Sequence, residues 1–321
     1  AASRHKFARH AMTIISASRK TDIPAFYGDW FRARRIAGSC EVRNAWSGKT
    51  FKVSLRDEDC SGFIFWTRNA KPFRPELDRT ARTHPFVVQY TVTGYPRSLE
   101  RSVVAADAGI EDIRDISVHY GGKSVVWRYD PVVITDATPA AWHIENFTRI
   151  AGALMGSVDE VVVSFAQIYR KTRRNLDRAA HETANAWVDP EDGAKRDLLA
   201  RLDEIARQSG LALSLCAQPA LEDGLTAARC IDATRLDRVA ESLGHAPVTG
   251  SIPASNKAPR AGCLCAQSRD IGSYETCPHG CVYCYAVGDP DKAKQAHKAH
   301  DRNAAMLGTE TTSPEPEKLP A

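Results

Sequence analysis

Cysteine is the residue type through which this sequence points most clearly to chemistry. The chain holds nine cysteines among 321 residues, and Cys277, Cys281 and Cys284 follow a C-x3-C-x2-C spacing. Thiolates are soft ligands that suit iron–sulfur clusters and zinc. Three thiolates on one short loop can hold three irons of a four-iron cluster, which leaves the fourth iron to a small molecule. The spacing therefore predicts a metal centre with one open position.

The residues between these cysteines suit a tight loop. Gly280 permits a sharp turn and Pro278 stiffens the entry to the loop. His279 could donate a hydrogen bond to a sulfur, but we expect it to be exposed to solvent. Two alternatives stay open, namely a structural zinc knuckle and a redox dithiol of Cys281 and Cys284. Zinc ribbons usually pair two C-x2-C knuckles and this chain has one, so an iron–sulfur centre is preferred.

A second group of cysteines has the count for a closed metal site. Four thiolates are the usual ligand set of structural zinc and of auxiliary iron–sulfur clusters. The alternative is that Cys216 and Cys230 are small buried hydrophobic residues. The two remaining cysteines, Cys40 and Cys60, have no partner close in sequence and are predicted to be structural. The members of the second group are Cys216, Cys230, Cys263 and Cys265.

Composition limits the class of protein. Hydrophobic residues make up 43% and charged residues 26% of the chain, as in ordinary soluble domains. Its apolar runs, such as Val161–Val163, are far shorter than the roughly 18 residues of a membrane span. Clustered cysteines in odd number argue against a secreted disulfide framework and predict a cytoplasmic protein. A net charge of +4 is too small to indicate nucleic acid by itself.

Short apolar runs that alternate with amphipathic stretches predict the elements that would position these cysteines. Apolar periodicity predicts helices over residues 141–154 and 195–208. This alternation predicts an α/β fold, a partial TIM-like (β/α)6 barrel with a C-terminal cysteine-rich cluster-binding loop. A doubly wound open sheet remains the alternative. The six predicted strands are Thr13–Ala17, Gly62–Thr67, Phe86–Thr93, Lys123–Tyr129, Glu160–Phe165 and Leu211–Cys216.

The same pattern divides the chain into four parts. Residues 1–11 are interpreted as a leader or tag, and residues 12–250 as the barrel core. Residues 251–286 form a cysteine-rich segment that closes the barrel. Residues 287–321 are poor in large apolar side chains and are predicted to be a flexible tail.

Several predicted strands end in polar residues, which lie in the last positions of a strand or directly after it. In β/α barrels the carboxyl ends of the strands carry the active site. Arginine there suits a ligand carboxylate and aspartate suits ribose hydroxyls. The alternative is that these residues only form ion pairs and turns. The candidates are Ser18, Arg19, Asp22, Thr67, Asn69, Arg128, Asp130, Ser164 and Gln167.

The three-cysteine motif, with Tyr283 before its last cysteine, resembles the signature of the radical S-adenosylmethionine (SAM) superfamily. The phrase Gly-Cys-x-Tyr-Cys-Tyr is especially similar to the spore photoproduct lyase branch. The resemblance implies that Cys277, Cys281 and Cys284 hold a [4Fe–4S] cluster whose fourth iron is chelated by SAM. It also implies reductive cleavage of a carbon–sulfur bond and an electron donor such as flavodoxin or ferredoxin.

Longer phrases resemble an uncharacterised bacterial family, a domain of unknown function with a cysteine-rich C-terminus. They lie at residues 16–24, 65–69, 127–131 and 268–272, and the resemblance covers residues 13–286. In the radical SAM superfamily the motif follows the first barrel strand, whereas here it follows all six predicted strands. We therefore expect a permuted arrangement in which the C-terminal loop folds back over the barrel mouth.

Two functions follow from these observations. The first is an enzyme that cleaves SAM to a 5'-deoxyadenosyl radical, or transfers a 3-amino-3-carboxypropyl group, with an unidentified substrate. The second is a zinc-stabilised nucleic-acid-binding module without SAM chemistry. Its support is a set of basic residues, although a solvated charged face is the commoner meaning of such runs. These residues are Arg32, Arg34, Arg35, Arg170, Lys171, Arg173 and Arg174.

Overall fold

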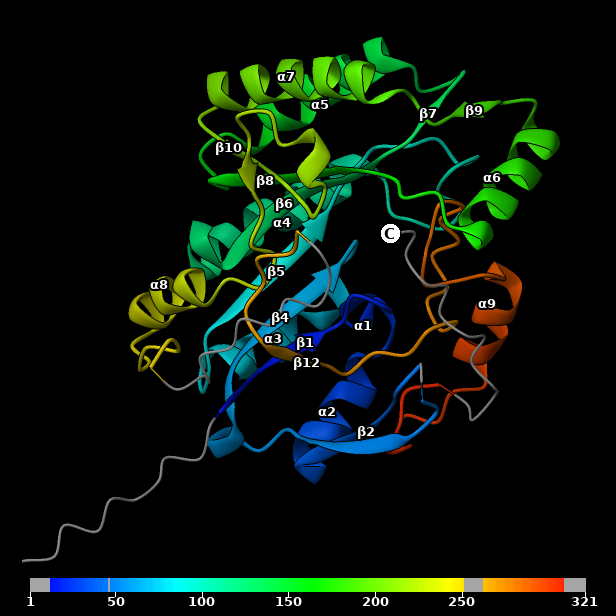
Figure 1. The fold of residues 1–321 in the computed structure, drawn as a ribbon. Helices are drawn as coiled ribbons and strands as arrows, with labels where there is room; N and C mark the ends of the chain where they lie inside the picture. Colours follow the sequence, from blue (N-terminus) through cyan, green and yellow to red (C-terminus); the bar gives the residue numbers. More distant parts are fainter. Residues whose placement is uncertain (1–11, 46, 251–261, 309–321) are drawn as a thin grey trace, which may run out of the picture.

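An eight-stranded parallel sheet forms the centre of the computed structural model (Figure 1). The structure describes residues 12–45, 47–250 and 262–308. Most strands are rich in β-branched and aromatic residues, which suit strands covered on both faces. In order across the sheet, the strands are β11 (Thr226–Ala227), β10 (Ala212–Leu215), β8 (Glu160–Phe165), β6 (Val125–Val132), β5 (Phe86–Thr91), β4 (Cys60–Thr67), β1 (Thr13–Ala17) and β12 (Ser268–Asp270).

The strand order confirms a parallel α/β fold but not a barrel. From β1 to β11 the strands follow chain order without the reversal that marks a doubly wound sheet. β12 pairs with the other side of β1, where Ile14 lies opposite Ser268. In a closed barrel, the last strand of the series, β11, would pair with the side of β1 that β12 occupies here. Across the described residues the sheet therefore stays open, with β11 and β12 at its edges, and the predicted TIM-like barrel is not confirmed.

Helices cover both faces of the sheet. Helices α4, α5 and α7 pack on one face, whereas α8 packs on the other, which we call the inner face. None of the described helices has the length and hydrophobicity of a bilayer-spanning helix. The helices are α1 (Ile23–Phe26), α2 (Gly28–Ala37), α3 (Arg74–Ala81), α4 (Ala106–Tyr120), α5 (Ala140–Leu154), α6 (Arg170–Thr183), α7 (Asp192–Gln208), α8 (Ala233–Leu243) and α9 (Pro290–Lys298).

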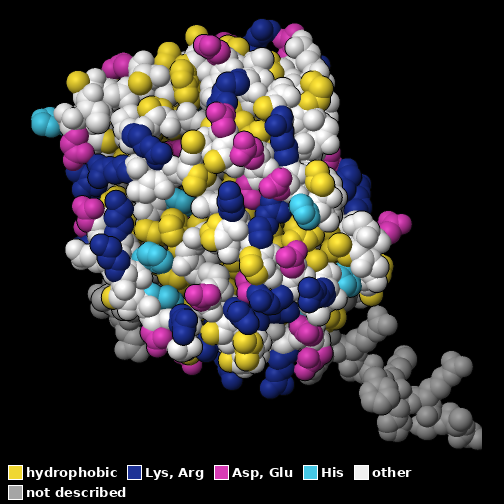
Figure 2. All heavy atoms as spheres, turned by 180° about the vertical axis from the view of Figure 1, so that it is seen from behind, with side chains coloured by type: hydrophobic (Ala, Val, Ile, Leu, Met, Phe, Trp, Pro, Cys, Tyr) yellow, Lys and Arg dark blue, Asp and Glu magenta, His cyan; other side chains and the backbone are white. Residues whose placement is uncertain are grey.

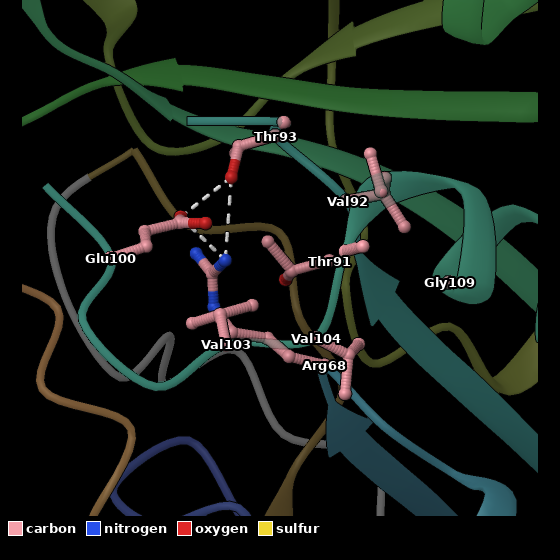
Figure 3. A pocket seen from close by; sticks show the side chains of 11 residues that line it. Arg68, Thr91, Val92, Thr93, Glu100, Val103, Val104 and Gly109 are labelled. Carbon is pink, nitrogen blue, oxygen red and sulfur yellow. Dashed lines mark hydrogen bonds and ion pairs between the residues drawn. The ribbon is translucent and has the colours of Figure 1, made fainter. Parts of the chain in front are cut away.

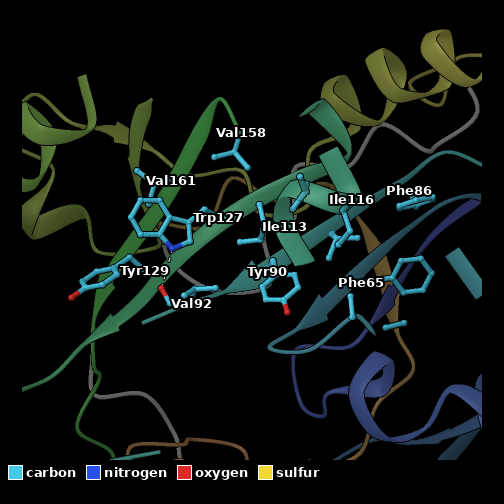
Figure 4. Close-up of a cluster of buried hydrophobic side chains, with 14 of the residues drawn as sticks. Phe65, Phe86, Tyr90, Val92, Ile113, Ile116, Trp127, Tyr129, Val158 and Val161 are labelled. Atoms are coloured by element: carbon cyan, nitrogen blue, oxygen red, sulfur yellow. Dashed lines mark hydrogen bonds between the residues drawn. The ribbon is translucent and has the colours of Figure 1, made fainter. Parts of the chain in front are cut away.

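Side chains along β6 point alternately to the two faces of the sheet, and this separates residues of the large core from residues of the candidate site. Val125, Trp127 and Tyr129 belong to the large hydrophobic core under α4 and α5 (Figure 4). Val126 belongs to the smaller core under α8, so the intervening residues point to the inner face. Arg128 is one of these and is buried there. Two short antiparallel pairs lie outside the sheet, β2 (Ser39–Arg43) with β3 (Thr50–Ser54), and β7 (Ile134–Thr135) with β9 (Trp187–Val188).

The C-terminal region is more ordered than its composition predicts. Residues 287–308 do not form a flexible tail: they include α9, whose His297 ring lies 5.0 Å from the ring of Tyr27 at the junction of α1 and α2. Asp289 caps α9 by accepting a hydrogen bond from the backbone of Asp291. The Trp30 indole nitrogen donates to the Ala304 carbonyl at 2.9 Å. Caps and backbone contacts, rather than large apolar side chains, hold this segment. The predicted leader (1–11) and the end of the predicted tail (309–321) lie outside the described residues.

On the face of the sheet that α5 covers, His143 of α5 is fully buried, and both of its ring nitrogens lie within hydrogen-bonding distance of a partner. One nitrogen lies 2.9 Å from the Tyr129 hydroxyl and the other 3.1 Å from the Val133 carbonyl. Neutral imidazole satisfies both contacts, with Tyr129 donating to the ring and the ring donating to the carbonyl. Burial lowers the pKa of His143 to about 4.

This histidine predicts a pH dependence of stability. The folded pKa lies below the ordinary histidine value near 6.5, so the unfolded chain binds more protons between pH 6.5 and pH 4. The free energy of unfolding should therefore fall as the pH drops through this window, by up to ~3 kcal/mol from His143. Urea unfolding of wild type and His143→Gln from pH 7 to pH 4.5 measures it. The variant should show the shallower fall, and identical slopes would contradict the assignment.

Candidate metal centre at the carboxyl edge of the sheet

The three-cysteine loop lies across the carboxyl ends of β1, β4 and β5, although it comes from the far end of the chain. Its backbone pairs with the loop that follows β5. Val282 donates to the Leu99 carbonyl at 3.0 Å, and Ser102 donates to the His279 carbonyl at 2.9 Å. The C-terminal segment that carries it is orange in Figure 1. The expectation that this loop folds back over the strand ends agrees with this geometry.

Cys277, Cys281 and Cys284 are half-buried, and their thiols lie near enough to one another to affect each other's pKa. Burial raises the pKa of Cys277 to about 12 and raises the pKa of the other two as well. The other two thiols raise the pKa of Cys281 further, because each additional negative charge nearby is unfavourable. Metal ligands must be deprotonated. Deprotonation of these three thiols is therefore unfavourable unless a positive charge lies close to them.

Backbone N–H groups point at two of these sulfurs. The Ala286 N–H donates to the Cys284 sulfur at 3.3 Å. Hydrogen bonds from the backbone of His279 and Asp22 lower the pKa of Cys277, although less than burial raises it. Such N–H donors stabilise thiolates and tune the metal that they bind.

Asp22, one of the predicted site residues, ties the loop to the sheet. Its carboxylate caps α1 through the Ala25 N–H at 2.9 Å and accepts from the Arg68 N–H at 2.8 Å. The His279 ring nitrogen Nε2 lies 2.7 Å from the same carboxylate. His279 is only 3% exposed, so the expectation that it faces solvent is wrong. Its second nitrogen, Nδ1, is buried without a hydrogen-bond partner in the described part of the chain.

Figure 3 shows a buried ion pair between Arg68 and Glu100, and both charges act on the thiol of Cys281. The Arg68 guanidinium contacts the Glu100 carboxylate at 2.6 Å and donates to the Tyr283 hydroxyl at 2.6 Å. Thr93 donates to Glu100 at 2.6 Å. The positive charge of Arg68 lowers the pKa of Cys281 against the larger effect of burial. Arg68 stands with Thr67 and Asn69 among the polar residues at the end of a predicted strand, whereas no sequence signal marked Glu100.

Three other predicted residues meet on the inner face. Arg128 forms an ion pair with Asp130, which also accepts a hydrogen bond from Ser164. The Arg128 guanidinium donates to the Gln89 side chain at 3.2 Å and lies 5.0 Å from the centre of the Trp66 ring. Residues from β4, β5, β6 and β8 thus form one polar layer on the inner face, toward the carboxyl ends of these strands.

Asp270 on β12 gathers the predicted residues at the end of β1. Its buried carboxylate accepts from the hydroxyls of Ser16 at 2.8 Å and Ser18 at 2.7 Å. It also accepts from the Arg19 N–H at 2.9 Å. A side chain at Gly272 would collide with Ser18, so the close approach requires glycine there. Asp270 was not predicted as a site residue because its strand, β12, has only three residues and gives no clear strand pattern.

The remaining predicted residues serve local turns. The Thr67 hydroxyl accepts from the Asn69 N–H at 2.9 Å, and the Asn69 side chain accepts from the Lys71 N–H at 3.3 Å. The Gln167 side chain accepts from the Tyr169 hydroxyl at 2.5 Å. The structure does not join these side chains to the polar layer.

The other six cysteines divide into two groups. Cys40 and Cys60 lie in the large core, consistent with a structural role. All nine cysteines are described and none forms a disulfide. Across the described ranges, no group of three or more His, Cys, Asp or Glu side chains has a geometry that could hold a metal ion, which includes both sets of cysteines. Four thiols nevertheless lie together on the inner face, and they are Cys216, Cys230, Cys263 and Cys265.

The basic residues considered for nucleic acid make contacts within the chain. Arg35 pairs with Asp57 at 2.8 Å, and Arg174 donates to the Gly288 carbonyl at 2.9 Å. Arg173 lies over a tryptophan ring. On the face shown in Figure 2, basic and acidic side chains are interspersed. These contacts agree with a solvated, ion-paired surface.

A family model matches residues 14–286, and the chain therefore belongs to that family, a domain of unknown function (DUF1848). No curated protein and no solved structure matched the chain significantly.

The buried ion pair beside Cys281 predicts a large effect on stability. Arg68→Met leaves the Glu100 carboxylate buried without its cation, so we expect the free energy of unfolding to fall by about 3–5 kcal/mol. The matched control is Arg149→Met, which breaks an exposed pair with Asp107 and should cost less than ~1 kcal/mol. Guanidinium unfolding curves measure both changes. Equal losses in the two variants would contradict a buried pair.

Proposed function

We propose that this member of the DUF1848 family is a [4Fe–4S]-dependent enzyme that reductively cleaves SAM. The supporting observation is that Cys277, Cys281 and Cys284 form one thiol group at the carboxyl edge of a parallel sheet. This edge is where β/α folds place their active sites. We also infer that the sheet is an opened form of a (β/α)6 barrel, because its strands follow chain order without reversal.

The side chains present suit a three-thiolate cluster. Each thiolate has its own stabilising group, which is a backbone N–H at Cys277 and Cys284 and the Arg68 guanidinium near Cys281. A dithiol would use only two of the three sulfurs. When bound, the cluster supplies the electron that breaks a carbon–sulfur bond of SAM, giving a 5'-deoxyadenosyl radical or a 3-amino-3-carboxypropyl group. That electron would come from a carrier such as flavodoxin or ferredoxin.

Partly exposed charged groups near the inner face could hold SAM and its substrate. The Arg19 side chain is 30% exposed and its guanidinium lies 3.7 Å from Asp270. The Asp130 side chain is 20% exposed beside Arg128. A guanidinium suits the carboxylate of SAM, and a carboxylate suits ribose hydroxyls. We assign these two roles to Arg19 and Asp130.

Substitution of one motif cysteine tests the proposal. Anaerobically purified wild type should be brown, with about four irons and four sulfides per chain. Cys281→Ala should lose this iron and all SAM cleavage, because the cluster would lose one of its three thiolates. Cys40→Ala, a cysteine change in the distant core, should keep both. Iron and sulfide analysis with mass spectrometry of the SAM products measures these outcomes.

Two results would contradict the proposal. One is a Cys281→Ala variant that cleaves SAM at the wild-type rate. The other is a colourless wild type that holds only zinc and binds nucleic acid, as the module hypothesis requires. Among supporting results, 5'-deoxyadenosine would identify radical chemistry, whereas methylthioadenosine would identify aminocarboxypropyl transfer.

The assigned role of Arg19 predicts a change in SAM affinity. Arg19→Met removes a charge-assisted hydrogen bond that contributes about 1.5–3 kcal/mol, so the Kd for SAM should rise at least about 10-fold. Arg201→Met on the exposed side of α7 is the control. Anaerobic equilibrium dialysis of the iron-loaded protein measures the Kd. An unchanged Kd in the Arg19 variant would show that Arg19 does not contact SAM.

A further inference from the structure

Four cysteines from separate segments converge on the inner face, apart from the three-cysteine loop. Cys216 directly follows β10, and Cys230 follows β11. Cys263 and Cys265 lie in the segment that leads into β12. All four belong to, or pack against, the same buried cluster under α8. Strands β11 and β12 are opposite edges of the sheet, so these thiols bring the two open edges together.

The sulfurs form a chain of close contacts. The Cys230 and Cys216 sulfurs are 3.5 Å apart. The Cys265 side chain contacts Cys230 on one side and Cys263 on the other. A disulfide would need about 2.05 Å between sulfurs, so the Cys216–Cys230 contact is not one. Four zinc–sulfur bonds of about 2.3 Å in a tetrahedron place the sulfurs about 3.8 Å apart.

We propose that Cys216, Cys230, Cys263 and Cys265 bind one zinc ion as a closed, structural tetrathiolate site. The 3.5 Å sulfur separation is close to one edge of such a tetrahedron. A four-iron cluster holds its cysteine sulfurs farther apart, because irons and sulfides lie between them. The four sulfurs do not surround one point in the described structure, so zinc binding requires them to move closer together.

Positive groups around these sulfurs suit the net charge of such a site. Four thiolates and Zn²⁺ together carry two negative charges. The buried Arg128 guanidinium donates to the Cys230 sulfur at 3.1 Å. The Ile231 N–H donates to the Cys265 sulfur at 3.4 Å. Arg19 is attracted by Cys263 and Cys265 from the β1 side.

The position of the site gives it a structural task. Among the strands of the described residues the sheet does not close by pairing, since β12 occupies the free side of β1. Beside the sulfurs, the Ala266 N–H already donates to the Ile231 carbonyl at 2.9 Å, which links the two segments. A zinc ion on the four thiolates would fasten the β10–β11 end to the β12 end. It would thus hold the β12 segment, and the three-cysteine loop that follows it, in place.

Metal analysis tests the zinc site separately from the proposed iron–sulfur function. Wild-type protein, purified anaerobically with zinc and iron in the medium, should contain about one zinc per chain. Cys230→Ala should lose at least about nine-tenths of it, and Cys281→Ala should retain it. Cys263→His, which keeps four ligands of accepted type, should also retain it. Circular dichroism establishes that each variant is folded.

Chelation of zinc from the wild-type protein tests the site without a substitution, so the result does not depend on whether a variant folds. Removal of zinc with a strong chelator should lower the Tm, and added Zn²⁺ alone should restore it. Added Co²⁺ should give the absorption bands of tetrahedral cobalt thiolate, and Cys230→Ala should lack them. A wild type without zinc, a Cys230→Ala variant that keeps it, or a second set of four irons lost in Cys230→Ala would each overturn the proposal.

Discussion

The buried carboxylate of Asp22 is the interaction on which the candidate site most depends. It accepts from α1, from the backbone at the end of β4, and from His279 within the cysteine loop. A carboxylate buried this deeply is stable only when its hydrogen bonds are satisfied. Three segments far apart in sequence must therefore be in place together. The loop that holds the three thiols is thus part of the fold rather than an attached tail.

A second buried carboxylate, Asp270, does the same for the edge of the sheet. Its hydrogen bonds with Ser16 and Ser18 fix β12 against β1. That pairing prevents closure of a barrel and also brings the C-terminal segment to the strand ends. In the usual order of a β/α enzyme, a motif loop at this position would follow β1 directly. Here β12 supplies the connection from the other end of the chain.

Local pattern was sufficient to predict much of this structure. The six predicted strands and both helices were found within a few residues of their positions, because buried apolar runs and helical periodicity are local signals. The grouping of the four inner-face cysteines also agrees with the sequence prediction, since their number alone suggested a site. Ser18, Arg128 and Ser164 were predicted from their places at or near the ends of predicted strands.

What the sequence could not predict depends on contacts between distant residues. Strand β12 has only three residues, and its pairing is decided by the Asp270 carboxylate. The Arg68–Glu100 pair joins two loops that meet only after the sheet forms. Helix α9 lacks large apolar side chains and is held by a cap and by backbone contacts. None of these leaves a periodic signal in the sequence.

The central claim is that three thiolates leave one position of a cluster open to SAM. The most direct measurement is electron paramagnetic resonance of the reduced, iron-loaded protein before and after SAM is added. The account predicts the signal of a reduced [4Fe–4S] cluster, and it predicts that SAM changes that signal because SAM becomes a ligand. Absence of an iron–sulfur signal, or a signal that saturating SAM leaves unchanged, would contradict it.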